Sequence, residues 1–355
     1  MLVSQINTEL EKNNELCTKI ESRVNVLMDN VKTDRILKKL LQIQTYAGSK
    51  LTNNVITSNV KYLLTDENTN FHNINYVSLY KAFNKSSILN KIDSIENLFE
   101  NATELITANL SHMFNESSKL EYIGSLENLF KNCKNLCSAN LEYMFKSCLK
   151  LQINTHTIYL NNLFEGCSNL TSVNFHKMFD SCVELQRVDS TRDMFLGCNN
   201  LKYIDFSYMF ANNKKLEEIS LANIFNGIPD DQKIKINTEY MFNQGSKNIH
   251  GLVVYLDYDF DDDDPTIMRH IGPDEFHISK HLYPIIRALP DGSMICVETN
   301  NYDKVKEWVT ELGEIEIEFI EYSERFFRKK SNKKQIFIKG FETDIGPRYY
   351  KYWLH

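Results

Sequence analysis

The chain has 355 residues, enough for two or three domains, and its 42% hydrophobic and 25% charged residues are ordinary for a soluble globular protein. Its formal net charge of −7 argues against bulk affinity for nucleic acid, because basic residues bind phosphates. No segment approaches the ~18 consecutive apolar residues of a transmembrane helix, and the N-terminus lacks a secretory signal. We therefore expect a cytoplasmic protein, within a cell or a virion, that has no membrane partner and keeps its eight cysteines reduced.

Residues 1–45 are predicted to be helical, because their side chains follow the seven-residue period of a coiled coil. One seam position is filled by Val3, Leu10, Cys17, Val24 and Val31, and the other by Ile6, Asn13, Ile20, Leu27 and Asp34. Two interpretations stay open. Residues 3–34 form a coiled coil that joins copies of the chain into a homo-oligomer, or the helix covers the first of the repeats that follow. Residues 46–80 have no clear periodicity and read as a linker or an entry segment.

The next segment, residues 81–245, repeats one phrase, as in MFKSCLKL (144–151) and MFDSCVEL (178–185). Similar units at a nearly fixed period are typical of a solenoid, in which each unit buries its apolar side against its neighbours. The anchoring phenylalanines lie 15 to 19 residues apart, at Phe83, Phe99, Phe114, Phe130, Phe145, Phe164, Phe179, Phe195, Phe210, Phe225 and Phe242.

Other positions of the phrase, counted from the phenylalanine, are also regular. Position +6 is leucine in nine successive copies, from Leu89 to Leu216, and position +9 is usually aliphatic. Position +10 is often Asn or Asp. Position +3 is small and becomes cysteine in Cys133, Cys148, Cys167, Cys182 and Cys198. These columns predict one continuous apolar core with a polar column beside it.

Two geometries fit the phrase. In the first, Leu-x-x-Ile-Asn-Phe is a short strand with alternating inward and outward side chains, and Met-Phe-x-x-Cys is a helical turn that returns the chain. In the second, the Asn or Asp caps a helix whose apolar stripe contains the Met, Phe, Cys and Leu positions. Pairs of such helices would build an all-α solenoid of helical hairpins.

The phrase Met-Phe-x-x-Cys-x-x-Leu-x-x-Ile/Val-Asp/Asn, seen at 144–151, 163–175, 178–189 and 194–206, resembles the BspA-type leucine-rich repeats of bacterial and protist surface proteins. It is also similar to repeats of large DNA viruses. The resemblance implies an α/β, leucine-rich-repeat-like solenoid and favours it over helical hairpins. The phrase is shorter than the family's repeat, so one coil can take one phrase or two. Members of the family are typically secreted, whereas this chain lacks the signal.

Residues 246–355 are predicted to be a separate, small α/β module. Strands are expected at 251–258 and 293–299, and helices at 275–289, kinked by Pro284, and at 302–313. Residues 314–322 alternate like a half-buried strand, and 335–341 are expected to pair with them as a hairpin.

Three groups of residues suggest metal chemistry but have simpler interpretations. The regular cysteines are interpreted as core residues, because they share one repeat position and no C-x-x-C pair occurs. His277 and His281 have the spacing of a metal-binding pair but lack the glutamate between them, and we interpret them as surface histidines. The acidic run from Asp257 to Asp264 lacks the glycine and final glutamate of an EF-hand loop, which favours a solvated turn. We predict no metal site and no cofactor.

Two sets of residues are candidate binding surfaces. If strands form, outward side chains at positions +8 and +10 line one face at ~4.8 Å intervals; if helices form, the +10 residues are caps. The candidate face consists of Asp93, Asn109, Tyr122, Asn140, Asn174, Arg187, Asp189, Tyr203 and Asp205. The second set is a basic loop, 325–334, with two phenylalanines among its cations, which is typical of a nucleic-acid site. Its cations are Arg325, Arg328, Lys329, Lys330, Lys333 and Lys334.

No nucleophile–base pair, glycine-rich phosphate loop or pair of catalytic carboxylates occurs, so we predict no enzymatic activity and no catalytic residue. The sequence favours a non-enzymatic protein-interaction or structural scaffold built on a repeat solenoid, with a protein partner of unknown identity. A component of a virus or phage particle is one version of this hypothesis. The alternative is a nucleic-acid-binding protein that acts through the basic loop.

Overall fold

The computed structural model describes residues 75–87, 89–92, 95–155, 157–243, 252–256, 278–290, 292–298, 302–312, 317–320 and 334–339. The predicted N-terminal helix, its seam at 3–34 and most of the 46–80 segment lie outside the described residues. The acidic run 257–264 and residues 325–333 of the basic loop also lie outside them. What the sequence predicts for these segments therefore stays a prediction.

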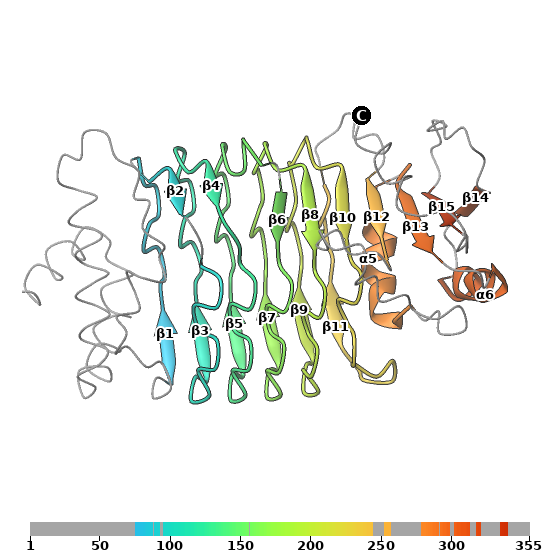
Figure 1. The fold of residues 1–355 in the computed structure, drawn as a ribbon, viewed down its shortest axis with the longest axis horizontal. Helices are drawn as coiled ribbons and strands as arrows, with labels where there is room; N and C mark the ends of the chain where they lie inside the picture. Colours follow the sequence, from blue (N-terminus) through green and yellow to red (C-terminus); the bar gives the residue numbers. More distant parts are fainter. Residues whose placement is uncertain are drawn as a thin grey trace, which may run out of the picture.

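Within the described ranges, parallel strands form three sheets, which lie in two rows along the molecule (Figure 1). The first sheet has the order β1-β3-β5-β7-β9-β11, with strands Tyr76–Ser78, Thr107–Asn109, Ser138–Asn140, Ser172–Asn174, Tyr203–Asp205 and Lys235–Asn237. The small sheet pairs β2 (Lys91–Ile92) with β4 (Tyr122–Ile123). The second sheet has the order β14-β15-β13-β12-β10-β8-β6. In chain order its strands are β6 (Thr157–Tyr159), β8 (Arg187–Ser190), β10 (Glu218–Ser220), β12 (Val253–Tyr255), β13 (Met294–Glu298), β14 (Ile317–Ile320) and β15 (Lys334–Lys339).

Each coil of this β-solenoid takes two phrases. Tyr76 in β1 pairs with Thr107 in β3, 31 residues later (107 − 76). One phrase therefore supplies a strand to the first sheet, and the next phrase supplies a strand to the other row. The predicted repeat solenoid is confirmed. The all-α alternative is wrong, because the described residues from β1 to β11 form strands and turns and contain no helix.

The Met-Phe-x-x-Cys segment is a series of tight turns and not the predicted helical turn. The residues two before and two after the phenylalanine have positive φ, as in Tyr143 (φ 56°) and Ser147 (φ 58°), whereas a right-handed helix needs negative φ. Within the turn, the Met144 N–H donates to the Leu141 carbonyl at 3.1 Å. The next N–H, from Phe145, donates to the Met178 carbonyl of the following coil at 2.9 Å. Alternate N–H groups thus close the turn and join the coils.

Two ladders of phenylalanine rings fill the interior. Successive rings have centroids 5.2–5.9 Å apart and planes within 12° of parallel. Such pairs contribute roughly 0.5–1.5 kcal/mol each beyond burial. The leucines at position +6 are buried beside them. The predicted core columns are therefore confirmed. One ladder consists of Phe83, Phe114, Phe145, Phe179, Phe210 and Phe242, and the other of Phe99, Phe130, Phe164, Phe195 and Phe225.

The cysteines at position +3 form a third column, the thiol ladder. They are free and buried, which confirms their predicted place in the core. Each thiol also donates a hydrogen bond, 3.0–3.2 Å long, to a phenylalanine carbonyl of the preceding coil. Ser117 fills the same position and donates from its hydroxyl to the Phe83 carbonyl at 2.7 Å. Burial raises the pKa of Cys148 and Cys198 to about 12, so these thiols keep the proton that they donate. The ladder consists of Cys133, Cys148, Cys167, Cys182 and Cys198.

The longest spacing, 19 residues between Phe145 and Phe164, coincides with the gap between β4 and β6. The extra residues begin at Gln152, whose side chain is buried. Its side-chain amide donates to the Ile123 carbonyl at 2.8 Å. In a continuous sheet, a backbone N–H of the next strand would donate to this carbonyl. The insertion therefore separates the small sheet from the second sheet.

The C-terminal segment continues the solenoid in a different form. β12 pairs with β10 and β13 pairs with β12, so the second sheet runs on without a break. The first sheet ends at β11, and the helices α5 (Tyr283–Ala288) and α6 (Tyr302–Leu312) lie below the strands that follow in Figure 1. β13 and α6 occur where the sequence predicted a strand and a helix.

Two predictions for this segment are wrong. β14 and β15 pair in parallel, with Ile317 opposite Lys334, and therefore do not form a hairpin. Pro284 does not kink a helix, because it lies in the first turn of α5, where its missing N–H costs no hydrogen bond. The described part of the predicted 275–289 helix is shorter, a 3-10 turn η2 (Lys280–Leu282) followed by α5.

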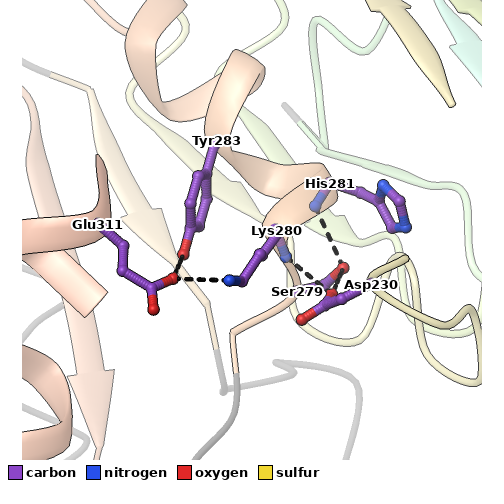
Figure 2. A network of polar contacts seen from close by, with 6 residues as sticks. All are labelled: Asp230, Ser279, Lys280, His281, Tyr283 and Glu311. Atoms are coloured by element: carbon purple, nitrogen blue, oxygen red, sulfur yellow. Dashed lines mark hydrogen bonds and ion pairs between the residues drawn. The ribbon is translucent and has the colours of Figure 1, made fainter. Parts of the chain in front are cut away.

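A network of polar contacts attaches this segment to the last repeat (Figure 2). Oδ1 of Asp230 accepts from the Ser279 hydroxyl at 3.2 Å and from the Lys280 N–H at 3.0 Å. Oε2 of Glu311 in α6 accepts from the Tyr283 hydroxyl at 2.9 Å and pairs with the Lys280 amine at 3.0 Å. Burial and the bond to Glu311 raise the pKa of Tyr283, so its hydroxyl stays a donor. η2 is therefore held on both sides.

Candidate functional site: an aromatic edge

The predicted interaction face is divided between opposite rows. Because successive phrases supply different sheets, the nine candidate residues do not line one face. Asp93 lies outside the described residues. Asn109, Asn140, Asn174, Tyr203 and Asp205 lie on the first sheet, whereas Tyr122 lies on the small sheet and Arg187 and Asp189 on the second.

On the first sheet, the Asn and Asp residues shape the backbone. The side-chain oxygen of each accepts a hydrogen bond from the N–H two residues later, as Asn140 does from Glu142 at 3.0 Å. The same contact occurs at 2.8–3.1 Å in Asn109, Asn174, Asp205 and Asn237. For Asp205, burial raises the pKa, but bonds from Ser207, Tyr203 and Asn237 outweigh it and leave the pKa lowered. These side chains start the turn that follows each strand.

On the second sheet, charged residues pair with one another. Nε of Arg187 lies 3.1 Å from Oδ1 of Asp189 and 3.1 Å from Oε2 of Glu218 in the next strand. On the small sheet, the Lys91 amine lies 5.2 Å from the ring centre of Tyr122. These charges are matched within the sheet, which leaves little reason to expect a charged partner here.

The two edges of the solenoid differ at one backbone position. Two residues before each phenylalanine, φ is 52–57° on both edges. On the edge that follows the small and second sheets, this position holds Asn97, Asn128, Asn162, Asp193 and Asn223, which tolerate left-handed backbone best after glycine. We call it the Asn edge. On the edge that follows the first sheet, it holds Lys81, His112, Tyr143, Lys177, Tyr208 and Tyr240.

Tyrosine and lysine are costly choices there, because an L-residue in this conformation loses roughly 1–2 kcal/mol. The cost recurs coil after coil on one edge alone. Something other than backbone conformation therefore accounts for these residues.

The rings of this second edge form a continuous column, which we call the aromatic edge. It consists of Tyr80, Lys81, His112, Tyr143, Lys146, His176, Lys177, Tyr208 and Tyr240. Successive rings lie 4.6–5.7 Å apart: His112 stacks on Tyr143 at 14°, Tyr208 and Tyr240 are tilted at 36°, and the other pairs lie edge to face. The His176 ring also lies 2.7 Å from the Ser207 hydroxyl. Unlike the phenylalanine ladders, these side chains are only partly buried, and Tyr240 is 51% exposed.

Lysine amines lie over these rings. The Lys81 amine is 5.0 Å from the centre of Tyr80, the Lys146 amine is 5.2 Å from Tyr143, and the Lys177 amine is 4.8 Å from Tyr208. Burial, and then the charges of Lys81 and Lys146, lower the pKa of His112, which keeps this ring neutral at pH 7. The edge therefore combines aromatic surface with fixed positive charge.

Among the residues that the structure describes, no three His, Cys, Asp or Glu side chains gather as metal ligands. His281 is not the predicted surface residue. It is buried, its Nε2 donates to the Pro229 carbonyl at 3.0 Å, and its ring lies against Phe225. His277 lies outside the described residues, as do the cations of the basic loop except Lys334 in β15.

The sequence contains a signal for the aromatic edge, but it is lost when every phrase is treated as equivalent. The residue two before phenylalanine alternates between Asn or Asp and a bulkier residue in successive phrases. That alternation becomes visible only when the repeat is read in pairs.

No protein-family model, curated protein or solved structure matches the chain significantly. Among the described residues, no helix has the length and apolar character needed to cross a membrane.

Proposed function

We propose that this chain is a non-enzymatic scaffold that binds another protein along the aromatic edge. One observation carries the proposal: tyrosines and lysines occupy left-handed positions on this edge, where the equivalent positions of the Asn edge hold Asn or Asp. Tyrosine is enriched at the centres of protein interfaces, because it offers a large ring and a polar hydroxyl with little conformational freedom to lose. The edge runs over six coils, or about 24 Å at ~4.8 Å per strand.

The buried cysteines of the thiol ladder are unsuited to act as catalytic nucleophiles. Burial raises the pKa of Cys148, Cys167, Cys182 and Cys198, and their thiols are engaged as donors to carbonyls. A nucleophilic cysteine needs the opposite, a lowered pKa and access to substrate.

Affinity capture from the source cells with three baits tests the proposal. The first bait is the native chain, and the second carries Tyr143→Asn and Tyr208→Asn, which give the aromatic edge the residue of the Asn edge. The third carries Asn128→Asp and Asn162→Asp, a conservative change on the Asn edge, since Asp193 already occupies that position. We expect a protein that the first and third baits retain and the second loses. Equal retention by all three baits contradicts binding through the aromatic edge.

The double variant is expected to fold. Each Tyr→Asn change removes two ring pairs of ~0.5–1.5 kcal/mol each, or roughly 1–3 kcal/mol. It also relieves a left-handed tyrosine at roughly 1–2 kcal/mol. The two terms nearly cancel, so circular dichroism and the urea midpoint should match those of the native chain within about 1 kcal/mol per site.

A further inference from the structure

The aromatic edge carries three ammonium groups that no carboxylate neutralises among the residues that the structure describes. These belong to Lys81, Lys146 and Lys177, and each is held over a tyrosine ring. Lys177 lies between two rings, 4.8 Å from Tyr208 and 5.6 Å from Tyr143. A lysine held in this way has lost part of its side-chain freedom, so it can bind an anion at a lower entropic cost.

The nearby acidic side chains are engaged in other contacts. Glu116 pairs with Lys85 at 3.4 Å and accepts from the Asn115 amide at 3.3 Å. Asp180 is buried and accepts from the Asn212 amide at 2.8 Å and from the Ser181 hydroxyl at 3.0 Å. Glu142 lies 3.4 Å from the Asn174 amide. The three lysines are partly exposed, and none of them forms an ion pair with a carboxylate in the part of the chain that the structure describes.

The charges of two of these lysines, Lys81 and Lys146, act on the same ring. The pKa of His112, which lies in the coil between those of Lys81 and Lys146, is lowered by burial first and then by both lysine charges, against the opposing charge of Glu116. Positive charge is therefore concentrated around His112, whereas burial, and then the carboxylates of Glu142, Asp180 and Glu239, raise the pKa of Tyr143 and Tyr208 farther along the edge.

We infer that the aromatic edge binds an extended acidic peptide segment of a partner protein, whose carboxylates pair with Lys81, Lys146 and Lys177 while its aliphatic atoms lie against the tyrosine ring edges. This inference rests on the proposed function and names the chemistry of its partner. Lys81, Lys146 and Lys177 belong to the coils of β1, β5 and β7, which span three strand spacings in the first sheet. That distance is about 14 Å, which an extended peptide covers in four or five residues at ~3.3 Å each.

A peptide fits better than a nucleic acid. Single-stranded nucleic acids bind by stacking bases on free aromatic faces. Here lysine amines lie over the rings of Tyr80, Tyr143 and Tyr208, and Tyr143 also stacks on His112 at 4.6 Å. A base therefore finds few faces to stack on, whereas carboxylates need only the ammonium groups.

Fluorescence anisotropy of labelled hexaglutamate with the full chain tests the inference. Binding is expected to weaken as salt rises and to fall at least tenfold in the variant with Lys146→Gln and Lys177→Gln. The matched control carries Lys131→Gln and Lys134→Gln on the Asn edge, where Lys131 has the same repeat position, one after phenylalanine, as Lys146. This control should bind as the native chain does. Labelled hexaglutamine should not bind.

Three outcomes overturn the inference. In the first, hexaglutamate does not bind. In the second, both lysine pairs reduce its binding equally, which indicates a nonspecific charge effect. In the third, labelled oligothymidylate binds more tightly than hexaglutamate with the same dependence on Lys146 and Lys177, which assigns the edge to nucleic acid. If the Tyr→Asn bait still loses a protein while hexaglutamate fails to bind, the proposed function stands and only the acidic character of its partner is wrong.

Discussion

Asn213 interrupts the thiol ladder, and its replacement by cysteine is expected to stabilise the protein. Asn213 lies three residues after Phe210, the position at which the preceding phrases have cysteine. Its side chain is fully buried, and neither its amide nitrogen nor its oxygen has a partner among the described residues. In Asn213→Cys, the thiol would lie where Cys198 and its neighbours donate to the carbonyl of the preceding coil, here that of Phe179.

The magnitude follows from the two unpaired atoms. An unsatisfied buried polar group costs about 1–3 kcal/mol. The thiol removes this cost and adds only a weak bond, so we expect a gain of about 1–3 kcal/mol in the free energy of unfolding. With a urea dependence of about 3 kcal/mol per molar, the midpoint should rise by about 0.3–1 M.

Urea unfolding followed by circular dichroism under reducing conditions provides the measurement. Cys182→Asn is the mirror experiment, because it places an amide in the ladder and removes the thiol that donates to the Phe145 carbonyl at 3.1 Å. Its midpoint should fall by a similar amount. An unchanged or lowered midpoint in Asn213→Cys would refute the reasoning, since it would mean that the Asn213 amide already has adequate partners.

Three further predictions concern reactivity, pH and backbone. Native-state alkylation followed by mass spectrometry should modify the partly exposed Cys137 and spare the thiol ladder, whose members react only after unfolding; equal labelling would contradict their burial. The lowered pKa of His112 means that the unfolded chain takes up a proton first as pH falls. The stability from this group is therefore complete above pH 6.5 and declines as pH falls below it, and His112→Gln should flatten that part of a stability–pH curve. Gly197→Ala should lower the free energy of unfolding by roughly 1–2 kcal/mol, because it places an alanine in left-handed backbone. Gly166→Ala should lower it further. Both glycines have positive φ, but only at Gly166 would a new Cβ meet the side-chain oxygen of Asn132, at 2.5 Å, and displace a side chain that donates to Asn101 at 3.1 Å. Equal urea midpoints would count against this steric account.

Much of the core could be predicted from the chain alone. Phenylalanine, cysteine and leucine recur at fixed offsets, and side chains that share an offset stack in any solenoid, so their burial did not depend on the details of the coil. The donor role of the thiols was not predictable in this way. It requires that the Phe114 carbonyl lie within 3.0 Å of Cys148, which is 34 residues away.

The candidate binding surface was only partly predictable. The alternation around Ile204 correctly placed Tyr203 and Asp205 on the outside of a strand. Their assignment to one face with Arg187 failed, because the period of the coil is two phrases. The aromatic edge was missed for the same reason, since Tyr143 and Asn162 occupy equivalent positions of successive phrases and separate only once the phrases are assigned to opposite sides.

The sequence by itself determined that the chain stacks, which residues enter the core and which positions face outward, because these follow from local periodicity and side-chain chemistry. Only the tertiary structure decided how many phrases close a coil, which edge each phrase forms, and that β14 and β15 run parallel. The physical reason is that coil closure depends on left-handed turn residues and on hydrogen bonds between groups about one coil apart, such as Phe145 and Met178. A local pattern specifies the strand and the turn, but the partner that each backbone group finds is a property of the folded chain.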